Sequence, residues 1–438
     1  MWIVGSSVTR KFAMKRFKKP AAWGASIFFP ALLLSCGPAP ETADLLITNA
    51  RVIDGNGTVL DHATIAITGE RIQSITSTEQ QFTAGTTIDA AGKTVLPGLI
   101  NTHIHIGSQG RFVDEQTLAE YLSNGLSADM QDYLDHGITS IKSTGDLTEP
   151  FLEVRESLAR GEIQGPRLFL VGPVLSAPEG HPSVTVYPDN PWLREGASRE
   201  LSTEEEARAV VHQLFESGVD AIKFVYHGSS DENRPYFLAP GLPIRKITPQ
   251  VMKAIIEEGH KHQLPVTAHT ADLEDAVAVI EAGVDGLEHG VTRERIPDEQ
   301  FGILLQEHQV FYGPTLSGYL NRSPEMADIL LPNLKGLADQ GVRIVLGTDG
   351  GPARGGSGID TLKEMEWMVQ AGMSPAQVIQ AGTRHAAELL GELDELGTLE
   401  AGKLADLIIV DGDPLKDISV IHNIEVVIKG GKVVADFR

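Results

Sequence analysis

Leu96-Pro97-Gly98-Leu99-Ile100-Asn101-Thr102-His103-Ile104-His105 is the stretch that decides the fold of this 438-residue chain. It is an apolar run that ends in two histidines. Because residues i and i+2 of a strand point to the same side, both imidazoles can leave one strand on one face. Strand-like alternation precedes this stretch, and short apolar runs alternating with amphipathic helical patterns follow it. The stretch therefore marks the passage from one domain into another.

Downstream, short apolar runs predict eight strands. They span residues 95–106, 138–143, 167–171, 221–225, 265–269, 286–289, 310–314 and 343–348. Helical patterns fall between them, over 203–217, 248–262, 273–282 and 324–339, and a last helix is predicted over 375–390. Eight β/α repeats favour an α/β fold with a (β/α)₈ TIM barrel over residues 99–390. A doubly wound sheet is the alternative, although it would not naturally give eight repeats.

The segments on either side of the barrel have β character. Residues 44–98 and 391–438 combine strand alternation with Gly-rich turns and lack a long helical period. Since the two segments flank the barrel, we expect a small β-sandwich domain built from both termini.

The N-terminus has the pattern of an export signal. Residues 1–35 carry six Lys or Arg and no acidic residue, and their apolar run ends in Leu33-Leu34-Ser35-Cys36-Gly37. This resembles a bacterial lipobox, which implies a signal peptide over 1–35, lipid on Cys36 and a tether over 36–43. The alternative is an ordinary signal peptide with an incidental cysteine. We expect an exported lipoprotein, periplasmic or at the cell surface, that meets the membrane only through its anchor.

Composition excludes several classes of protein. Hydrophobic residues make up 42% and charged residues 22%, as in ordinary globular proteins. A net charge of −23 disfavours a nucleic-acid partner, because phosphate backbones are held by positive charge. With one cysteine in the chain, neither an intramolecular disulfide nor a Cys₄ metal site can form.

Six chemically active side chains fall in or at the ends of predicted strands: His103, His105, Lys223, His269, His289 and Asp349. In a TIM barrel the carboxyl ends of the strands meet on the face that holds the active site. Imidazole and carboxylate groups suit Zn²⁺ and similar divalent ions. One such histidine alone would more often be a hydrogen-bonded core residue, but the whole set predicts a metal site.

These residues resemble the amidohydrolase superfamily, over about residues 44–438. The matching pieces are the stretch quoted above, the single histidines His269 and His289, Gly347-Thr348-Asp349, and the tail Gly397-Thr398-Leu399-Glu400-Ala401-Gly402-Lys403-Leu404-Ala405-Asp406-Leu407. Within the superfamily the chain is similar to the imidazolonepropionase-like branch, which includes Xaa-Pro and Xaa-Arg dipeptidases and ochratoxin-type amidases.

The resemblance implies a hydrolase with two divalent metal ions, expected to be Zn²⁺, that cleaves an amide bond of a small molecule such as a dipeptide or N-acyl amino acid. One ion would be held by His103, His105 and Asp349, and the other by His269 and His289. A CO₂-derived carbamate on Lys223 and a hydroxide would bridge the two ions. The hydroxide would attack the carbonyl, and Asp349 would pass its proton to the leaving amine.

Two predicted loops, 175–201 and 226–246, are long for a barrel and are expected to set specificity. His181, Tyr226 and His227 are the candidates for binding substrate, for example its carboxylate. Surface loops with satisfied polar groups are an equally simple interpretation. Lys142, at the end of the second strand, could face the site or form a salt bridge.

Other functions remain open at this stage. A mononuclear deaminase or cyclic-amidine hydrolase of the same superfamily would lack the bridging lysine, and many place a glutamate where this chain has Asp272. A phosphotriesterase or lactonase would share the binuclear site, and a lipid-anchored binding protein would have lost catalysis. Family members often form homo-oligomers, but the sequence shows no interface.

Overall fold

The computed structural model describes residues 41–77, 82–107, 112–228, 243–350 and 358–438. Cys36 and the predicted signal peptide lie outside these ranges. The first strand, β1 (Glu41–Ile53), begins within the predicted tether. Residues 41–43 are therefore part of a sheet and not of a linker. Within the described ranges, no helix is both long and apolar enough to cross a membrane.

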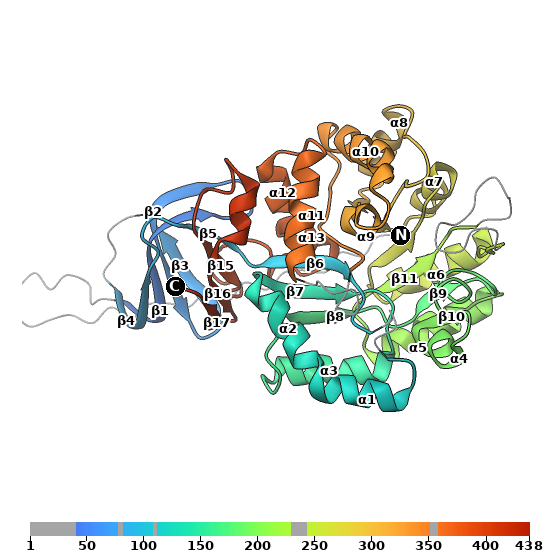
Figure 1. The fold of residues 1–438 in the computed structure, drawn as a ribbon, viewed down its shortest axis with the longest axis horizontal. Helices are drawn as coiled ribbons and strands as arrows, with labels where there is room; N and C mark the ends of the chain where they lie inside the picture. Colours follow the sequence, from blue (N-terminus) through green and yellow to red (C-terminus); the bar gives the residue numbers. More distant parts are fainter. Residues whose placement is uncertain (1–40, 78–81, 108–111, 229–242, 351–357) are drawn as a thin grey trace, which may run out of the picture. The chain divides into compact units, whose positions relative to one another are not determined.

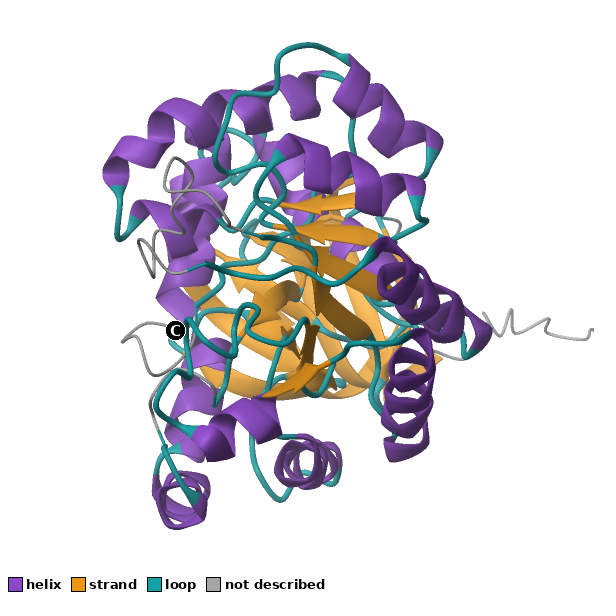
Figure 2. Cartoon of the chain, turned by 90° about the vertical axis from the view of Figure 1, so that its right-hand side faces the viewer, coloured by secondary structure: helices purple, strands orange, loops and turns teal. Residues whose placement is uncertain are grey.

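Parallel strands form the centre of the larger domain (Figures 1 and 2). One sheet contains β6 (Leu99–Ile104), β7 (Ile138–Ser143) and β8 (Arg167–Leu170). A second sheet has the order β10-β9-β11-β12-β13-β14, and its strands are β9 (Val174–Ser176), β10 (Ser198–Glu200), β11 (Ile222–Val225), β12 (Val266–His269), β13 (Gly286–Glu288) and β14 (Phe311–Gly313).

Main-chain hydrogen bonds connect the two sheets into a ring. The Asp220 N–H, before β11, donates to the Leu170 carbonyl of β8 over 2.7 Å. On the other side, Tyr312 of β14 bonds to Arg343, and Leu346 accepts from the Thr102 N–H of β6 over 2.8 Å. The segment predicted as the eighth strand is therefore a hydrogen-bonded connection between β14 and β6. The fold is TIM-barrel-like.

Helices surround this ring (Figure 2). They are α1 (Glu115–Asn124), α2 (Leu126–Asp135), α3 (Thr148–Ala159), α4 (Pro191–Ala197), α5 (Glu204–Ser217), α6 (Pro249–Lys261), α7 (Leu273–Glu281), α8 (Gln300–Glu307), α9 (Leu316–Leu320), α10 (Ala327–Asp339), α11 (Gly358–Gln370), α12 (Pro375–Ala381) and α13 (Arg384–Leu389). α5 begins as predicted, because Thr203 and Glu206 form a capping box, and it ends at Gly218 in the left-handed region.

The helix predicted over 375–390 is wrong as one element, since α12 and α13 are separate. The reason is the Gly382 carbonyl, which accepts a hydrogen bond from the Ile100 N–H of β6 over 2.8 Å. A Cβ at Gly382 would also lie 2.8 Å from a Leu346 methyl group. The close approach to the barrel thus interrupts the helix.

The two ends of the chain share one eight-stranded sheet. Its order is β17-β16-β15-β5-β1-β2-β3, with β4 paired to β1. The strands after β1 are β2 (Val59–Thr68), β3 (Arg71–Thr76), β4 (Phe82–Asp89), β5 (Thr94–Pro97), β15 (Leu407–Val410), β16 (Ile424–Lys429) and β17 (Lys432–Asp436). Residues of the N-terminal and C-terminal strands, such as Ile67 of β2 and Ile428 of β16, belong to one core cluster. The terminal domain is therefore a single sheet folded around its own core.

The stretch predicted as one strand over 95–106 divides at Gly98. Residues before it pair with β15 in the terminal sheet, and residues after it pair with β7 in the barrel. A Cβ at Gly98 would lie 2.2 Å from the Thr139 hydroxyl, so only glycine fits where the chain passes between the sheets. This change of sheet coincides with the predicted domain boundary at 98/99.

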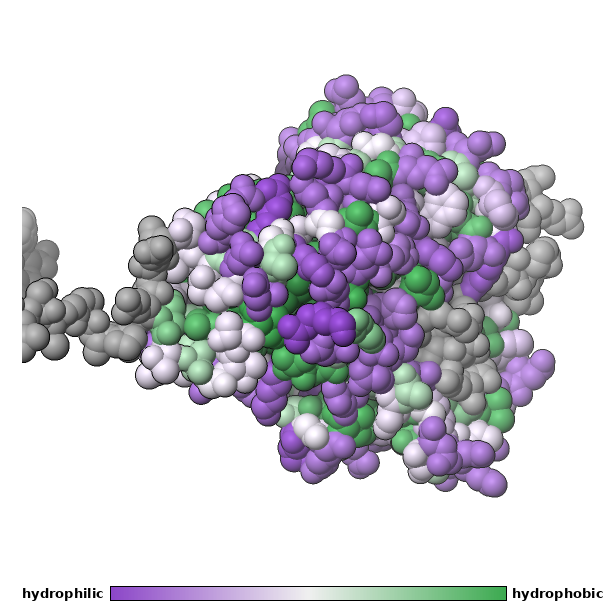
Figure 3. Space-filling model, turned by 60° about the vertical axis from the view of Figure 1, so that its left-hand side comes forward, coloured by the Kyte–Doolittle hydropathy of each residue, from purple (hydrophilic) through white to green (hydrophobic). Residues whose placement is uncertain are grey.

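Few large apolar side chains are exposed among the described residues. Figure 3 shows hydrophilic side chains over much of this face, with hydrophobic residues between them. The large exposed apolar residues among those described are Val113, Phe215, Ile303, Val433 and Phe437. Single exposed apolar residues are ordinary on soluble surfaces and need no partner.

Because the C-terminal strands complete the core of the terminal sheet, we expect Ile409→Ala to lower the free energy of unfolding by about 2–5 kcal/mol. Ile409 is 1% exposed, whereas Val433 on β17 is 42% exposed. The control Val433→Ala is therefore expected to change stability by less than about 0.5 kcal/mol. Urea unfolding of both variants tests this; equal losses would contradict the shared core.

Candidate metal centre

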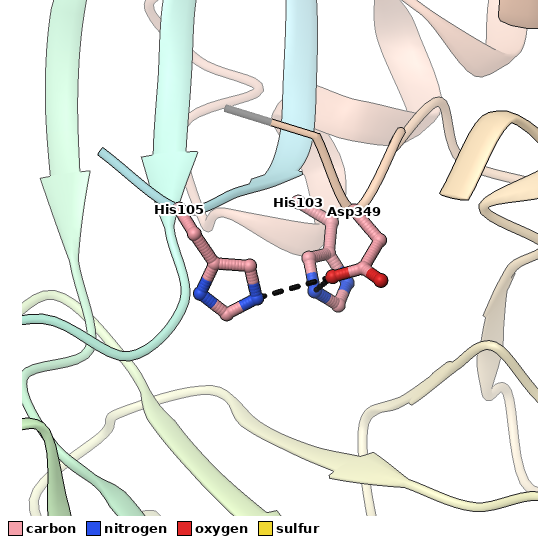
Figure 4. A group of neighbouring side chains, drawn as sticks. All are labelled: His103, His105 and Asp349. Atoms are coloured by element: carbon pink, nitrogen blue, oxygen red, sulfur yellow. Dashed lines mark ion pairs between the residues drawn. The ribbon is translucent and has the colours of Figure 1, made fainter. Parts of the chain in front are cut away.

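Three of the predicted ligands meet at the join between β6 and the last barrel segment. The N–H groups of Thr348 and Asp349 both donate to the His103 carbonyl, over 3.1 and 3.0 Å. The Asp349 Oδ1 then lies 3.4 Å from His103 Nε2 and 3.1 Å from His105 Nε2 (Figure 4). One donor atom from each of the three residues lies within 4.8 Å of the others, so they could hold one metal ion.

The remaining predicted ligands lie beside this group. The rings of His103 and His289 are 4.8 Å apart, and those of His269 and His289 are 4.5 Å apart. Lys223 Nζ lies 3.1 Å from His103 Nε2. The structure thus brings all six predicted residues together at one end of the ring.

Glu288 is a buried carboxylate that the sequence analysis missed. Its Oε1 accepts hydrogen bonds from Lys142 Nζ (2.9 Å) and the Thr267 hydroxyl (2.7 Å). Its Oε2 lies 2.7 Å from Lys223 Nζ and 3.1 Å from His103 Nδ1. Lys142 therefore forms the salt bridge that was one of its two expected roles. The available signal was Glu288 itself, a charged residue in the short apolar run before His289.

The protonation states at this site suit a metal. Burial, with the nearby Lys223 ammonium, lowers the pKa of His103 to about 4, and burial also holds the pKa of His269 and His289 well below the usual value. Burial opposes ionisation of Asp349, but hydrogen bonds from His103 and His105 outweigh it and lower the carboxyl pKa. Uncharged imidazoles and ionised carboxylates are the forms that bind divalent ions.

Two further observations support a fit to metal. His269 Nε2 is buried and has no hydrogen-bond partner among the described residues. The Thr315 hydroxyl orients the ring of His289, because it lies 2.7 Å from His289 Nδ1. The other ring nitrogen, Nε2, is left to bind a metal. Asp349, His289 and Thr315 all have positive φ, of 51°, 70° and 46°. Strained non-glycine backbone of this kind concentrates at functional sites.

The predicted substrate-binding residues separate into two groups. His181 and His227 flank a predicted ligand, since their rings lie 4.8 and 5.9 Å from that of His269. Tyr226 instead packs beneath Lys246, whose Nζ lies 4.9 Å from its ring centre. Successive residues of an extended chain face opposite sides, so Tyr226 is the weaker candidate for contact with a substrate.

Arg293 is a second residue that the sequence analysis did not identify. It lies 3.0 Å from His227 Nε2 through one nitrogen and 3.3 Å from Asp272 through another. Asp272 is thus part of an ion pair beside the centre. Arg293 follows β13 by several residues, and nothing in its local sequence distinguishes it from a surface arginine.

The chain is similar to several known proteins in sequence and fold. The model of the amidohydrolase family matches residues 94–434. Ochratoxinase from Aspergillus niger is 28% identical over 447 residues, covering 92% of this chain and 88% of that protein. Imidazolonepropionase from Geobacillus kaustophilus is 25% identical, covering 88% and 91%. The crystal structure of a Xaa-Pro dipeptidase with bound methionine in its active site superposes with a TM-score of 0.73 at 27% identity, covering 89% and 99%.

We expect Glu288→Gln to weaken metal binding, because it removes the anion that faces Lys142, Lys223 and His103. Loss of a group that supports a metal ligand typically lowers metal affinity about 10–100-fold. The measurement is metal content after equilibration at limiting metal, with circular dichroism to verify folding. Glu205→Gln, at an exposed position of α5, is the control. Unchanged affinity in a folded Glu288→Gln protein would show that this carboxylate does not support the centre.

Proposed function

From the premise that this chain belongs to the amidohydrolase family, we propose that it hydrolyses an amide bond of a dipeptide or N-acyl amino acid with two divalent metal ions. It is an enzyme of the hydrolase class that acts on carbon–nitrogen bonds. The finer parts of the proposal concern the metal count, the state of Lys223 and the substrate.

The observation that carries the proposal is the position of Lys223 among the imidazoles. Its side chain is 3% exposed, and its Nζ lies 3.1 Å from His103 Nε2. His103, His105 and Asp349 would hold one ion, and His269 and His289 the other. Such ions, expected to be Zn²⁺, lower the pKa of water towards neutrality and polarise a substrate carbonyl.

A carbamate on Lys223 would supply the anion between these two groups of ligands. The uncharged amine adds to CO₂ through a new N–C bond and releases one proton. Glu288 would then lose the ammonium group that now faces its Oε2. Lys142 Nζ, 2.9 Å from Oε1, supplies a cation that does not depend on Lys223. The buried carboxylate therefore keeps a partner in either state of Lys223.

Asp349 is the proposed proton carrier. It is ionised at neutral pH, and its side chain is 20% exposed, so it can reach a water molecule at the mouth of the ring. It accepts a proton as the nucleophile forms and donates it to the leaving amine. The main chain orients this residue, since the Asp349 N–H donates to the His103 carbonyl over 3.0 Å.

The substrate class rests on the relatives and on the groups around His269. Ochratoxinase and a Xaa-Pro dipeptidase are among the similar proteins, and the latter holds methionine in its active site. On this chain, His181 and His227 lie beside His269, and the Arg293 guanidinium lies behind His227. In our proposal, the carboxylate of an amino-acid substrate accepts hydrogen bonds from these side chains.

The proposal includes the cell location. A lipid anchor on Cys36 would place the enzyme at the periplasmic or outer surface of a membrane. The support is the lipobox-like sequence alone, as Cys36 is outside the described ranges.

The metal count tests the core of the proposal. We expect two tightly held metal ions per protomer by elemental analysis, and one or none in Lys223→Ala. One ion that is unaffected by Lys223→Ala would favour a mononuclear deaminase or cyclic-amidine hydrolase. A screen of cyclic amidines and amino-heterocycles would then replace the amide screen.

Asp349→Asn tests the proton-transfer role. The carboxamide keeps the shape of the side chain but cannot accept a proton, so we expect kcat on dipeptides or N-acyl amino acids to fall by about 10²–10⁴-fold with the fold intact. Near-normal turnover would remove Asp349 from catalysis. Activity of the parent enzyme on lactones or phosphotriesters, with none on amides, would contradict the substrate class.

A further inference from the structure

A second group of potential metal ligands lies outside the ring, between helices α5 and α6. It consists of His212 of α5, and Glu258 and His262 at the end of α6. His212 Nδ1 is 3.1 Å from His262 Nε2, which is itself 3.0 Å from Glu258 Oε1. We infer that these three residues form a binding site for one Zn²⁺-like ion, separate from the catalytic centre.

The distances fit one ion. Two nitrogens bound to the same tetrahedral zinc ion at about 2.0–2.1 Å lie roughly 3.3 Å apart. The pair of ring nitrogens and the nitrogen–oxygen pair are both close to this separation. All three donor atoms lie within 4.8 Å of one another, so a small movement is enough to surround an ion.

The orientation of His212 also fits. Its other nitrogen, Nε2, lies 3.3 Å from the Glu216 carboxylate, one helical turn later. A neutral imidazole has one N–H, and donation from Nε2 to Glu216 leaves the Nδ1 lone pair facing His262. A carboxylate behind a ligating histidine is the usual support at protein metal sites.

Without an ion, the contacts at His262 Nε2 compete. This one nitrogen lies between the His212 lone pair and the Glu258 oxygen, but it can offer them a single hydrogen. A divalent cation would satisfy all three donors together. Hydrogen bonding from Lys261, then from His262, holds the pKa of Glu258 below its usual value, so the carboxylate is ionised.

The pair formed by Glu258 and His262 is largely fixed in place. Their side chains are 7% and 12% exposed, and the His262 ring stacks on Phe215 at 4.1 Å. The one exposed ligand is His212, at 49%, through which an ion could enter. Lys261 and Arg208, which face Glu258 at 2.6 and 3.8 Å, are 64% and 39% exposed, so their charged ends have room to turn towards solvent.

The position indicates a structural role. α5 leads into β11, which carries Lys223, and α6 leads into β12, which carries His269. His262 caps the end of α6 that precedes β12, so it lies at the opposite end of the strand from His269. An ion there would join the two helices at the face of a barrel that is associated with stability.

The test adds Zn²⁺ to enzyme whose tightly held metals are already in place, with binding followed by calorimetry. We expect one further equivalent to bind and to raise Tm, since a ligand that binds only the folded state stabilises it. His212→Ala removes an exposed ligand and should abolish that equivalent and the rise in Tm. The retained metals and the hydrolytic activity should not change. His262→Ala should have the same effect on zinc.

His308→Ala, at an exposed position after α8, is the matched control and should keep the additional equivalent. Absence of further Zn²⁺ binding in the parent enzyme would overturn the inference. So would an additional equivalent that survives both His212→Ala and His262→Ala. Because the comparison starts from the metals already retained, it is independent of how many ions the catalytic centre holds.

Discussion

The contact between the first barrel strand and the last barrel segment is the constraint on which the rest of the structure depends. The His103 carbonyl accepts hydrogen bonds from the N–H groups of Thr348 and Asp349, and Leu346 accepts one from Thr102. These bonds close the ring and also set the position of the Asp349 carboxylate beside the imidazoles. A single set of main-chain hydrogen bonds therefore serves both the fold and the site. Substitutions that move this join should affect both.

The closed ring holds several charged side chains in its interior. Glu288, Lys142 and Lys223 are each at most 5% exposed, and burying such groups is unfavourable unless they are paired. Their short mutual contacts provide the pairing, and the Thr267 hydroxyl completes the hydrogen bonding of Glu288. Glu288 and Lys223 also lie next to His103, so the pairing of these buried charges helps to orient a predicted metal ligand. His212 and His262, between α5 and α6, form a separate cluster of histidines outside the ring.

The sequence predicted much of this organisation because its signals are local. Seven of the eight predicted barrel strands contain regular strands, and the start of α5 follows from a capping box that lies within four residues. The break between α12 and α13 was not predictable, because it arises from a hydrogen bond between Gly382 and Ile100, which are far apart in the chain. The partners of Glu288 and Arg293 were not predictable either, because they come from other strands and loops.

By itself, the sequence determined the alternation of strands and helices and the six residues that fall in or at the ends of predicted strands. It also predicted the change from the terminal β segment to the barrel at residues 98/99. The tertiary structure alone decided which of these groups meet and which side chains hydrogen-bond to them. Lys142 bonds to Glu288, Thr315 to His289, and Arg293 to His227. The physical reason is that periodicity and capping act over a few residues, whereas buried charges and hydrogen bonds are satisfied by whatever the closed ring brings within about 3 Å.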